Sequence, residues 1–186
     1  MTTTETRTET QWALDKVHSS INFWGRQMGV STVRGRFNDF DVSLSVRDDR
    51  PESARIEARI RSASVDTGFP PRDQHLAGPD FLDAEHYPEI VFRSTSVESG
   101  TDDRLRMEGE LTIKETTRPV SVDVRLDGIT QGTAGGRRVA FIGTTVIDRR
   151  DWGLTWNMPA GSDAVLVGYE IHLEFDLTFE EQPGQG

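Results

Sequence analysis

The four histidines, His18, His75, His86 and His172, carry the side chains whose protonation changes near neutral pH. None shows the spacing of zinc-binding motifs such as His-x-His or His-Glu-x-x-His. We therefore expect no metal site and no cofactor, and local hydrogen bonding is the plainer role for His75 and His86. His172 alternates with acidic residues, which predicts an outward, solvated side chain.

Two groups of arginine and aspartate could act through charge. Arg72 and Asp73 begin a helical segment, whereas Asp148, Arg149 and Asp151 follow an expected strand. A carboxylate near a helix N-terminus is stabilised by the helix dipole, and a buried Arg–Asp pair would hold the segment in place. Alternatively, Arg72 or Arg149 faces an opening and binds an anionic head group, because the guanidinium fork matches phosphate. The structural role is favoured.

Signatures of common catalytic sites are missing. The chain has no cysteine, which excludes disulfides, thiol nucleophiles and cysteine metal sites. It also lacks a Gly-x-Ser-x-Gly elbow, and the glycine-rich run 132–136 lacks the Lys-Ser/Thr ending of a phosphate loop. We name no catalytic residue. An enzyme that acts on an amphiphile through His75, Asp73 or His86 stays as an alternative to a binding protein.

One short segment, about residues 71–83, is predicted to form a helical cover. Pro70 and Pro71 suit a first helical turn, where a missing N–H costs no hydrogen bond. Gly78 and Pro79 follow as a stop signal.

The rest of the ordered chain alternates apolar and polar residues, as half-buried strands do. The clearest case is 165–179, where every odd residue is apolar. The apolar phase slips between Phe37 and Phe40, which predicts a bend near Asn38 and Asp39. Strands of this number indicate an antiparallel barrel or sandwich. Because such long strands would leave exposed edges unless the sheet closes, we predict an all-β fold, an eight-stranded antiparallel barrel.

The pattern leaves open whether this barrel is filled or hollow. Its expected inward residues mix phenylalanines with small residues such as Gly25, Gly35, Ala58, Gly109 and Gly143. Small residues opposite large ones are typical of a packed core, but they could equally leave a lumen. A filled barrel would favour an interaction or stress-related scaffold.

The composition and the net charge limit which classes of partner are expected. The net charge of −10 would repel nucleic acid and anionic bilayers, and the arginines are scattered among acids. We therefore expect no nucleic acid partner and no stable membrane insertion. The start, 1–10, has no apolar run, so a signal peptide is not expected and we predict a cytoplasmic protein. Expected boundaries are a tail at 1–10, one domain at 11–180 and a tail at 181–186.

The order and spacing of several short motifs resemble the YceI-like family of polyisoprenoid-binding proteins over about residues 12–178. The motifs are Trp12-x-x-Asp15, His18-Ser19-x-Ile21-x-Phe23, Val33-x-Gly35-x-Phe37, Arg72-Asp73-x-His75-Leu76, Phe81-Leu82-Asp83, Tyr87-Pro88-x-Ile90-x-Phe92, Gly109-x-Leu111-Thr112-Ile113 and Arg149-x-Asp151-Trp152-Gly153-Leu154. The resemblance implies a lipocalin-like barrel with a long apolar tunnel that binds isoprenoid-type or other long-chain amphiphiles.

From this resemblance we predict a carrier of an isoprenoid or fatty-acyl lipid; whether two chains form a homodimer is left open. Arg72 and His75 are the predicted head-group contacts at the mouth. The predicted tunnel lining consists of Phe23, Phe37, Phe92, Met107, Val122, Val124, Phe141, Ile171, Leu173 and Phe175.

Overall fold

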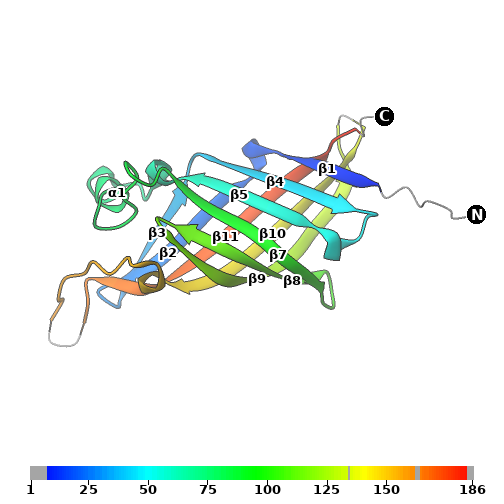
Figure 1. The fold of residues 1–186 in the computed structure, drawn as a ribbon. Coiled ribbons are helices and arrows are strands. Elements are labelled where there is room, and N and C mark those ends of the chain that lie inside the picture. Colours follow the sequence, from blue (N-terminus) through cyan, green and yellow to red (C-terminus); the bar gives the residue numbers. More distant parts are fainter. Residues whose placement is uncertain (1–7, 134, 162–163, 184–186) are drawn as a thin grey trace, which may run out of the picture.

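The alternating segments form strands of one antiparallel sheet in the computed structural model, which describes residues 8–133, 135–161 and 164–183 (Figure 1). The strands are β1 (Glu9–Leu14), β2 (Ser20–Gln27), β3 (Ser31–Phe37), β4 (Phe40–Arg47), β5 (Arg55–Arg61), β6 (Val65–Asp66), β7 (Glu89–Ser99), β8 (Arg104–Ile113), β9 (Thr116–Gln131), β10 (Arg137–Asp148) and β11 (Val167–Glu181). The single α-helix of the described residues is α1 (Pro70–Ala77), and the short 3-10 helices are η1 (Lys16–His18), η2 (Pro51–Ser53), η3 (Ser62–Ser64) and η4 (Arg149–Trp152).

The sheet closes on itself because β11 pairs with β10 on one side and with both β1 and β2 on the other. Three consecutive pairs of strands, β1 with β2, β3 with β4 and β5 with β6, each share one position around the barrel. The eleven strands therefore occupy eight positions, which confirms the predicted eight-stranded antiparallel barrel.

The bend predicted from the slip in the apolar pattern separates β3 from β4. The strand stops at Phe37 and resumes at Phe40, with Asn38 and Asp39 in a bend between them. At the neighbouring barrel position, η1 interrupts the chain between β1 and β2 in the same way. Its N-cap residue, Asp15, accepts hydrogen bonds from two backbone N–H groups. The two interruptions let the chain bend around the core at the barrel positions shared by β1 and β2 and by β3 and β4.

Helix α1 stops at Ala77, earlier than the predicted cover of about 71–83. Gly78 is its C-cap, and Pro79 cannot continue the helical hydrogen bonds. The remaining residues of the predicted cover form turns, and Asp83 adopts a left-handed backbone conformation with φ 47°. The cover is therefore one short helix followed by a folded loop that leads into β7.

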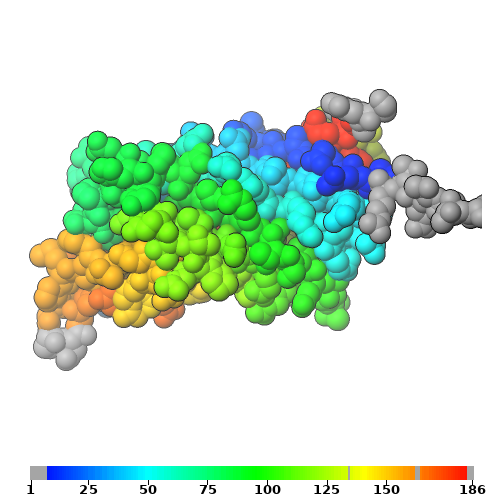
Figure 2. All heavy atoms as spheres, viewed as in Figure 1, coloured from blue at the N-terminus to red at the C-terminus, as the bar shows by residue number. Residues whose placement is uncertain are grey.

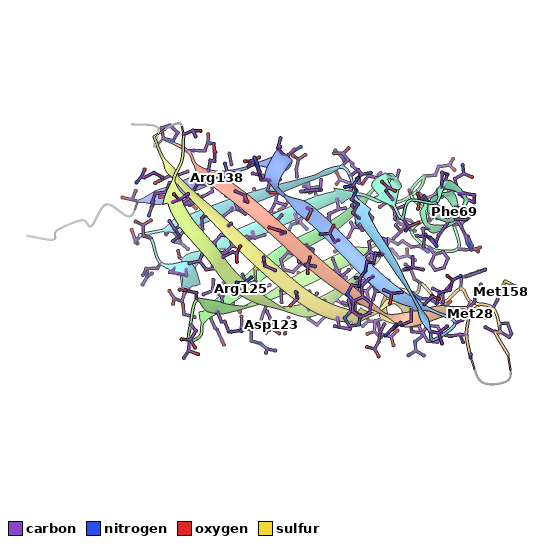
Figure 3. All side chains as sticks on the ribbon, turned by 180° about the vertical axis from the view of Figure 1, so that it is seen from behind. Met28, Phe69, Asp123, Arg125, Arg138 and Met158 are labelled. Carbon is purple, nitrogen blue, oxygen red and sulfur yellow. The ribbon has the colours of Figure 1, made fainter. Side chains whose placement is uncertain are left out.

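The ends of the barrel differ, and Figure 3 shows both. Phe69, Met28 and Met158 lie at the end that carries α1, which we call the α1 end, and Arg138 lies at the opposite end. That opposite end, called here the open end, gathers the connections that follow β4, β7 and β9, as antiparallel pairing requires.

Strand β1 begins at Glu9, two residues inside the predicted tail 1–10, and β11 ends at Glu181. Residues 1–7 and 184–186 of the predicted tails lie outside the described residues. Within the described ranges, no helix has the length and apolar character needed to cross a membrane.

Candidate functional site

A cavity of about 370 Å³ occupies the open-end half of the barrel. Its wall is almost entirely apolar, whereas polar side chains gather at the rim. The barrel wall on the face seen in Figure 2 is continuous, so this face offers no lateral opening. Rim residues include Asp49, Ser99, Asp103, Arg104 and Arg137. The site is therefore an apolar pocket with a polar rim.

On each of eight strands the cavity lining stops at one residue, and on most of these strands the inward residues beyond it are buried. These deepest lining residues, called here the floor, are Ile21, Val42, Ala58, Phe92, Met107, Val122, Gly143 and Phe175. Beyond the floor lie residues that are each less than 9% exposed, namely Phe40, Ile60, Ile90, Leu111, Ile113, Val120 and Ile147. The barrel is therefore hollow at the open end. Beyond the floor, buried side chains of β4, β5 and β7 to β10 pack the interior, whereas the inward residues of β2 and β11 there, such as Phe23 and Leu173, are half-buried.

Close approach of aromatic rings to glycine backbones shapes the interior. A Cβ atom on Gly109 would overlap the ring of Phe92, and one on Gly35 would overlap the ring of Phe23. Only glycine leaves room for a ring to lie flat on the strand at these two positions. Each ring thus takes space that would otherwise continue the bore.

Arg137 dominates the electrostatics of the rim. It donates to Glu181 from Nε at 2.9 Å and from Nη2 at 3.0 Å, and Nη2 also lies 2.9 Å from Asp49. The hydrogen bonds from Arg137 lower the pKa of Glu181 to about 2. The guanidinium lies 5.4 Å from the ring centroid of Trp12. Arg137 is therefore already committed to two carboxylates and a ring.

The α1 end is closed by an aromatic cluster. His75 lies edge-on to Trp156 at 4.4 Å and to Phe81 at 5.1 Å between ring centroids, and its Nε2 lies 2.9 Å from Asp80 Oδ2. Trp152 donates from Nε1 to the carbonyl of Leu111, and this hydrogen bond holds η4 against β8. These contacts are packing contacts that close this end.

Six of the ten predicted lining residues surround the cavity, namely Phe92, Met107, Val122, Val124, Phe141 and Phe175. The other four, Phe23, Phe37, Ile171 and Leu173, lie toward the α1 end, where they pack against the buried core. Alternation placed these ten residues on inward faces, but it could not tell which half of the barrel is hollow. It also missed Val97, which turns inward after the register shift in β7.

Arg72 and His75 lie at the α1 end and do not line the cavity. Arg72 donates from Nε to the Thr67 hydroxyl at 2.7 Å and from Nη2 to the Thr67 carbonyl at 3.1 Å. A head-group role for the two residues stays a prediction. The rim residues were not found from the sequence, although one signal was available. In an antiparallel barrel the connections alternate between the two ends, so the turns far from the cover could have been grouped.

The groups named for the alternative enzyme do not meet in the cavity. Asp73 accepts hydrogen bonds from the backbone and hydroxyl of Thr67 at 2.8 and 2.5 Å, and His86 Nδ1 lies 2.9 Å from Asp83. The described residues contain no group of three or more His, Asp or Glu side chains that could hold a metal ion.

His172 is less solvated than its alternation with acids predicts. Its ring stacks on Trp24 with 3.5 Å between centroids and 8° between planes. The pair lies on the outward face, where β11 meets β2 in register.

Comparison with known proteins places these features in a family. The profile of the YceI-like domain matches residues 12–179. A UPF0312 protein of Shewanella baltica is 34% identical over 164 residues, covering 88% of this chain and 81% of the relative. A UPF0312 protein of Vibrio parahaemolyticus is 31% identical over 157 residues, covering 84% and 81%.

Three solved structures share the fold. The crystal structure of BcnA from Burkholderia cenocepacia has a TM-score of 0.77 at 23% identity and covers 89% of this chain and 98% of its own. The Campylobacter jejuni YceI protein has a TM-score of 0.74 at 24% identity, covering 85% and 90%. A polyisoprenoid binding domain from Saccharophagus degradans has a TM-score of 0.64 at 16% identity, covering 92% and 98%.

Proposed function

The chain belongs to the YceI-like domain family, and from that membership and its apolar cavity we propose that it binds the apolar tail of a long-chain amphiphile such as a polyisoprenoid. The observation that carries the proposal is the cavity of about 370 Å³, with apolar walls and polar groups only at its rim. Burial of a tail there contributes about 25 cal/mol per Å² of apolar surface, before the costs of ordering. The polyisoprenoid binding domain of Saccharophagus degradans supports the choice of tail.

The rim favours a compact head group without charge, such as an alcohol. Asp49 and Asp103 balance Arg104 and Arg137 there, and Arg137 is engaged by Glu181 and Asp49. A diphosphate would need several free donors to replace its water, and it would approach these carboxylates at close range. A prenyl alcohol needs only one or two hydrogen bonds.

Binding accounts for the cavity better than catalysis does. The titratable groups of the alternative enzyme, His75, Asp73 and His86, have local structural partners away from the cavity. The filled half of the barrel agrees with a scaffold, but a scaffold gives no reason for the hollow half.

The test is native mass spectrometry of the purified full chain, followed by titration with farnesol and with farnesyl diphosphate. We expect a bound lipid or a one-to-one farnesol complex, with weaker binding of the diphosphate. If the wild-type protein repeatedly shows neither a bound lipid nor a farnesol complex, the proposal is refuted.

A matched pair of variants separates the cavity from the surface. Val124→Trp fills the cavity, whereas Val146→Trp makes the same change at an outward position that is 51% exposed. We expect Val124→Trp to abolish farnesol binding and Val146→Trp to leave it unchanged. Equal binding by the two variants would place the ligand outside the cavity.

A further inference from the structure

We propose that Phe92 is the residue that sets the length of chain the cavity accepts. The inference rests on the proposed function, because it concerns how that same cavity selects its ligand. Phe92 is 7% exposed and belongs to the floor, where the hollow half of the barrel meets the filled half. A tail that enters from the rim ends against this ring.

Phe92 can lie across the floor because its neighbours are small. Ala58 is its register partner on β5, and Gly109 on β8 lies beneath the ring. The β7–β8 register shifts between Ser94 and Ser96, which follow Phe92 in the direction of the open end. A bulge increases the local twist of a strand, and it turns the following residues relative to the preceding ones. The small neighbours and the bulge together hold the ring of Phe92 in one orientation across the floor.

The space beyond the ring is closed by well-packed side chains. Ile60 and Ile90, the next inward residues on β5 and β7, are 4% and 6% exposed, and Leu111 on β8 is 5% exposed. Interiors of this kind are close-packed and do not open for a ligand without cost. Removal of the Phe92 ring therefore deepens the cavity by the volume of that ring and leaves the packed half in place.

A change on the other side of the floor should have the opposite effect. Gly143 on β10 lines the cavity, and a Cβ there would lie 3.1 Å from Val122 Cγ1 and 3.6 Å from Phe175 Cδ2. A valine at this position would place its methyl groups into the floor. Gly143→Val therefore makes the cavity shallower, while Phe92→Ala makes it deeper.

Phe23 offers a matched control for the loss of a ring. Like Phe92, it lies over a glycine of the next strand, Gly35. Unlike Phe92, it does not line the cavity and packs toward the α1 end. Phe23→Ala reproduces the loosening caused by a lost ring without moving the floor.

The experiment measures the Kd of octanol, dodecanol, hexadecanol and eicosanol for the full chain and its variants, by displacement of a fluorescent fatty alcohol. Each added methylene that the cavity admits should lower Kd about fourfold, and the improvement should stop at the length the floor allows. Phe92→Ala should move that limit to longer alcohols and Gly143→Val to shorter ones, whereas Phe23→Ala should keep the wild-type limit.

Equal shifts in Phe92→Ala and Phe23→Ala, or no shift in Phe92→Ala, would overturn the inference while leaving lipid binding intact. Absence of binding by the wild type in the whole series would overturn the proposed function and the inference with it. Phe92→Leu, a milder change, should give a smaller shift in the same direction, and it serves if the alanine variant does not fold.

Discussion

Arg149 shows how a single residue closes the α1 end. It is 4% exposed, and its guanidinium donates from Nε to the carbonyl of Gly168 at 3.0 Å and from Nη2 to that of Val167 at 3.1 Å. Nη1 donates to the carbonyl of Leu154, and the charge lies 4.8 Å from the ring centroid of Tyr169. Burial lowers the pKa of Arg149, yet arginine keeps its proton in proteins. From η4, the residue thus binds the chain both at Leu154 and at the start of β11.

Arg149→Met should lower the free energy of unfolding by roughly 2–4 kcal/mol, because three carbonyl groups lose their donor in a buried place. The control is Arg150→Met, since Arg150 is exposed and pairs with Asp148. That change should cost less than about 1 kcal/mol. Urea unfolding of the two variants gives the comparison, and equal losses would contradict the role assigned to Arg149.

At the scale of elements, α1 and the loop after it form a plug for the filled half of the barrel. Thr67 joins the plug to β6 through Asp73 and Arg72. His75 joins it to the 154–167 loop through the ring of Trp156. Because the cavity lies in the other half, the plug should affect local stability and leave ligand binding alone.

His75→Ala should destabilise the plug by about 1 kcal/mol, through the lost aromatic contacts and the lost hydrogen bond to Asp80. Hydrogen exchange of residues 70–84 should become faster, while the Kd for farnesol should not change. His86→Ala is the control, because the His86 side chain is 71% exposed. A large loss of farnesol affinity in His75→Ala would instead restore His75 as a head-group contact.

The elements themselves were largely readable from the sequence, because the period of alternation fixes both the strands and their inward faces. The bend at Asn38 and Asp39 and the stop of α1 at Gly78 also followed from local rules. The location of the cavity did not follow. Whether Phe23 or Phe92 borders empty space depends on how rings and glycines of different strands meet, and no single strand contains that information.

At the scale of the whole molecule, ion pairs reinforce the closure of the barrel near the open end. Arg138 on β10 reaches across β11 to Asp15, at 2.6 Å, and also binds Glu180 at 2.7 Å. Burial alone would raise the pKa of Asp15, but hydrogen bonds from His18 and Arg138 lower it to about 2. Glu181 is held similarly by Arg137.

Acid should weaken this closure. The pKa of Glu181 is lowered from 4.5 to about 2 in the folded protein, so its contribution is complete above about pH 4.5 and is lost as the pH falls toward 2. Allowing for solvent screening, the contribution is roughly 1–2 kcal/mol.

Glu181→Gln should lower the free energy of unfolding by that amount at pH 7 and by progressively less below pH 4.5, as measured by urea unfolding across pH. The control is Glu174→Gln, an exposed position on the same strand. A constant difference between Glu181→Gln and the wild type down to the lowest pH would rule out the proposed ion pair as its source.

The pairing of β11 with β1, β2 and β10 has a consequence for the order in which the protein can fold. The first strands and β11 are at opposite ends of the described sequence, yet Trp12 lies in register with Glu181 and Leu14 with Phe179. During synthesis, the inner faces of ten strands must wait for β11 to emerge from the ribosome before the wall is complete. Over that interval the nascent chain exposes apolar surface along two unpaired edges, the kind of surface on which aggregation begins.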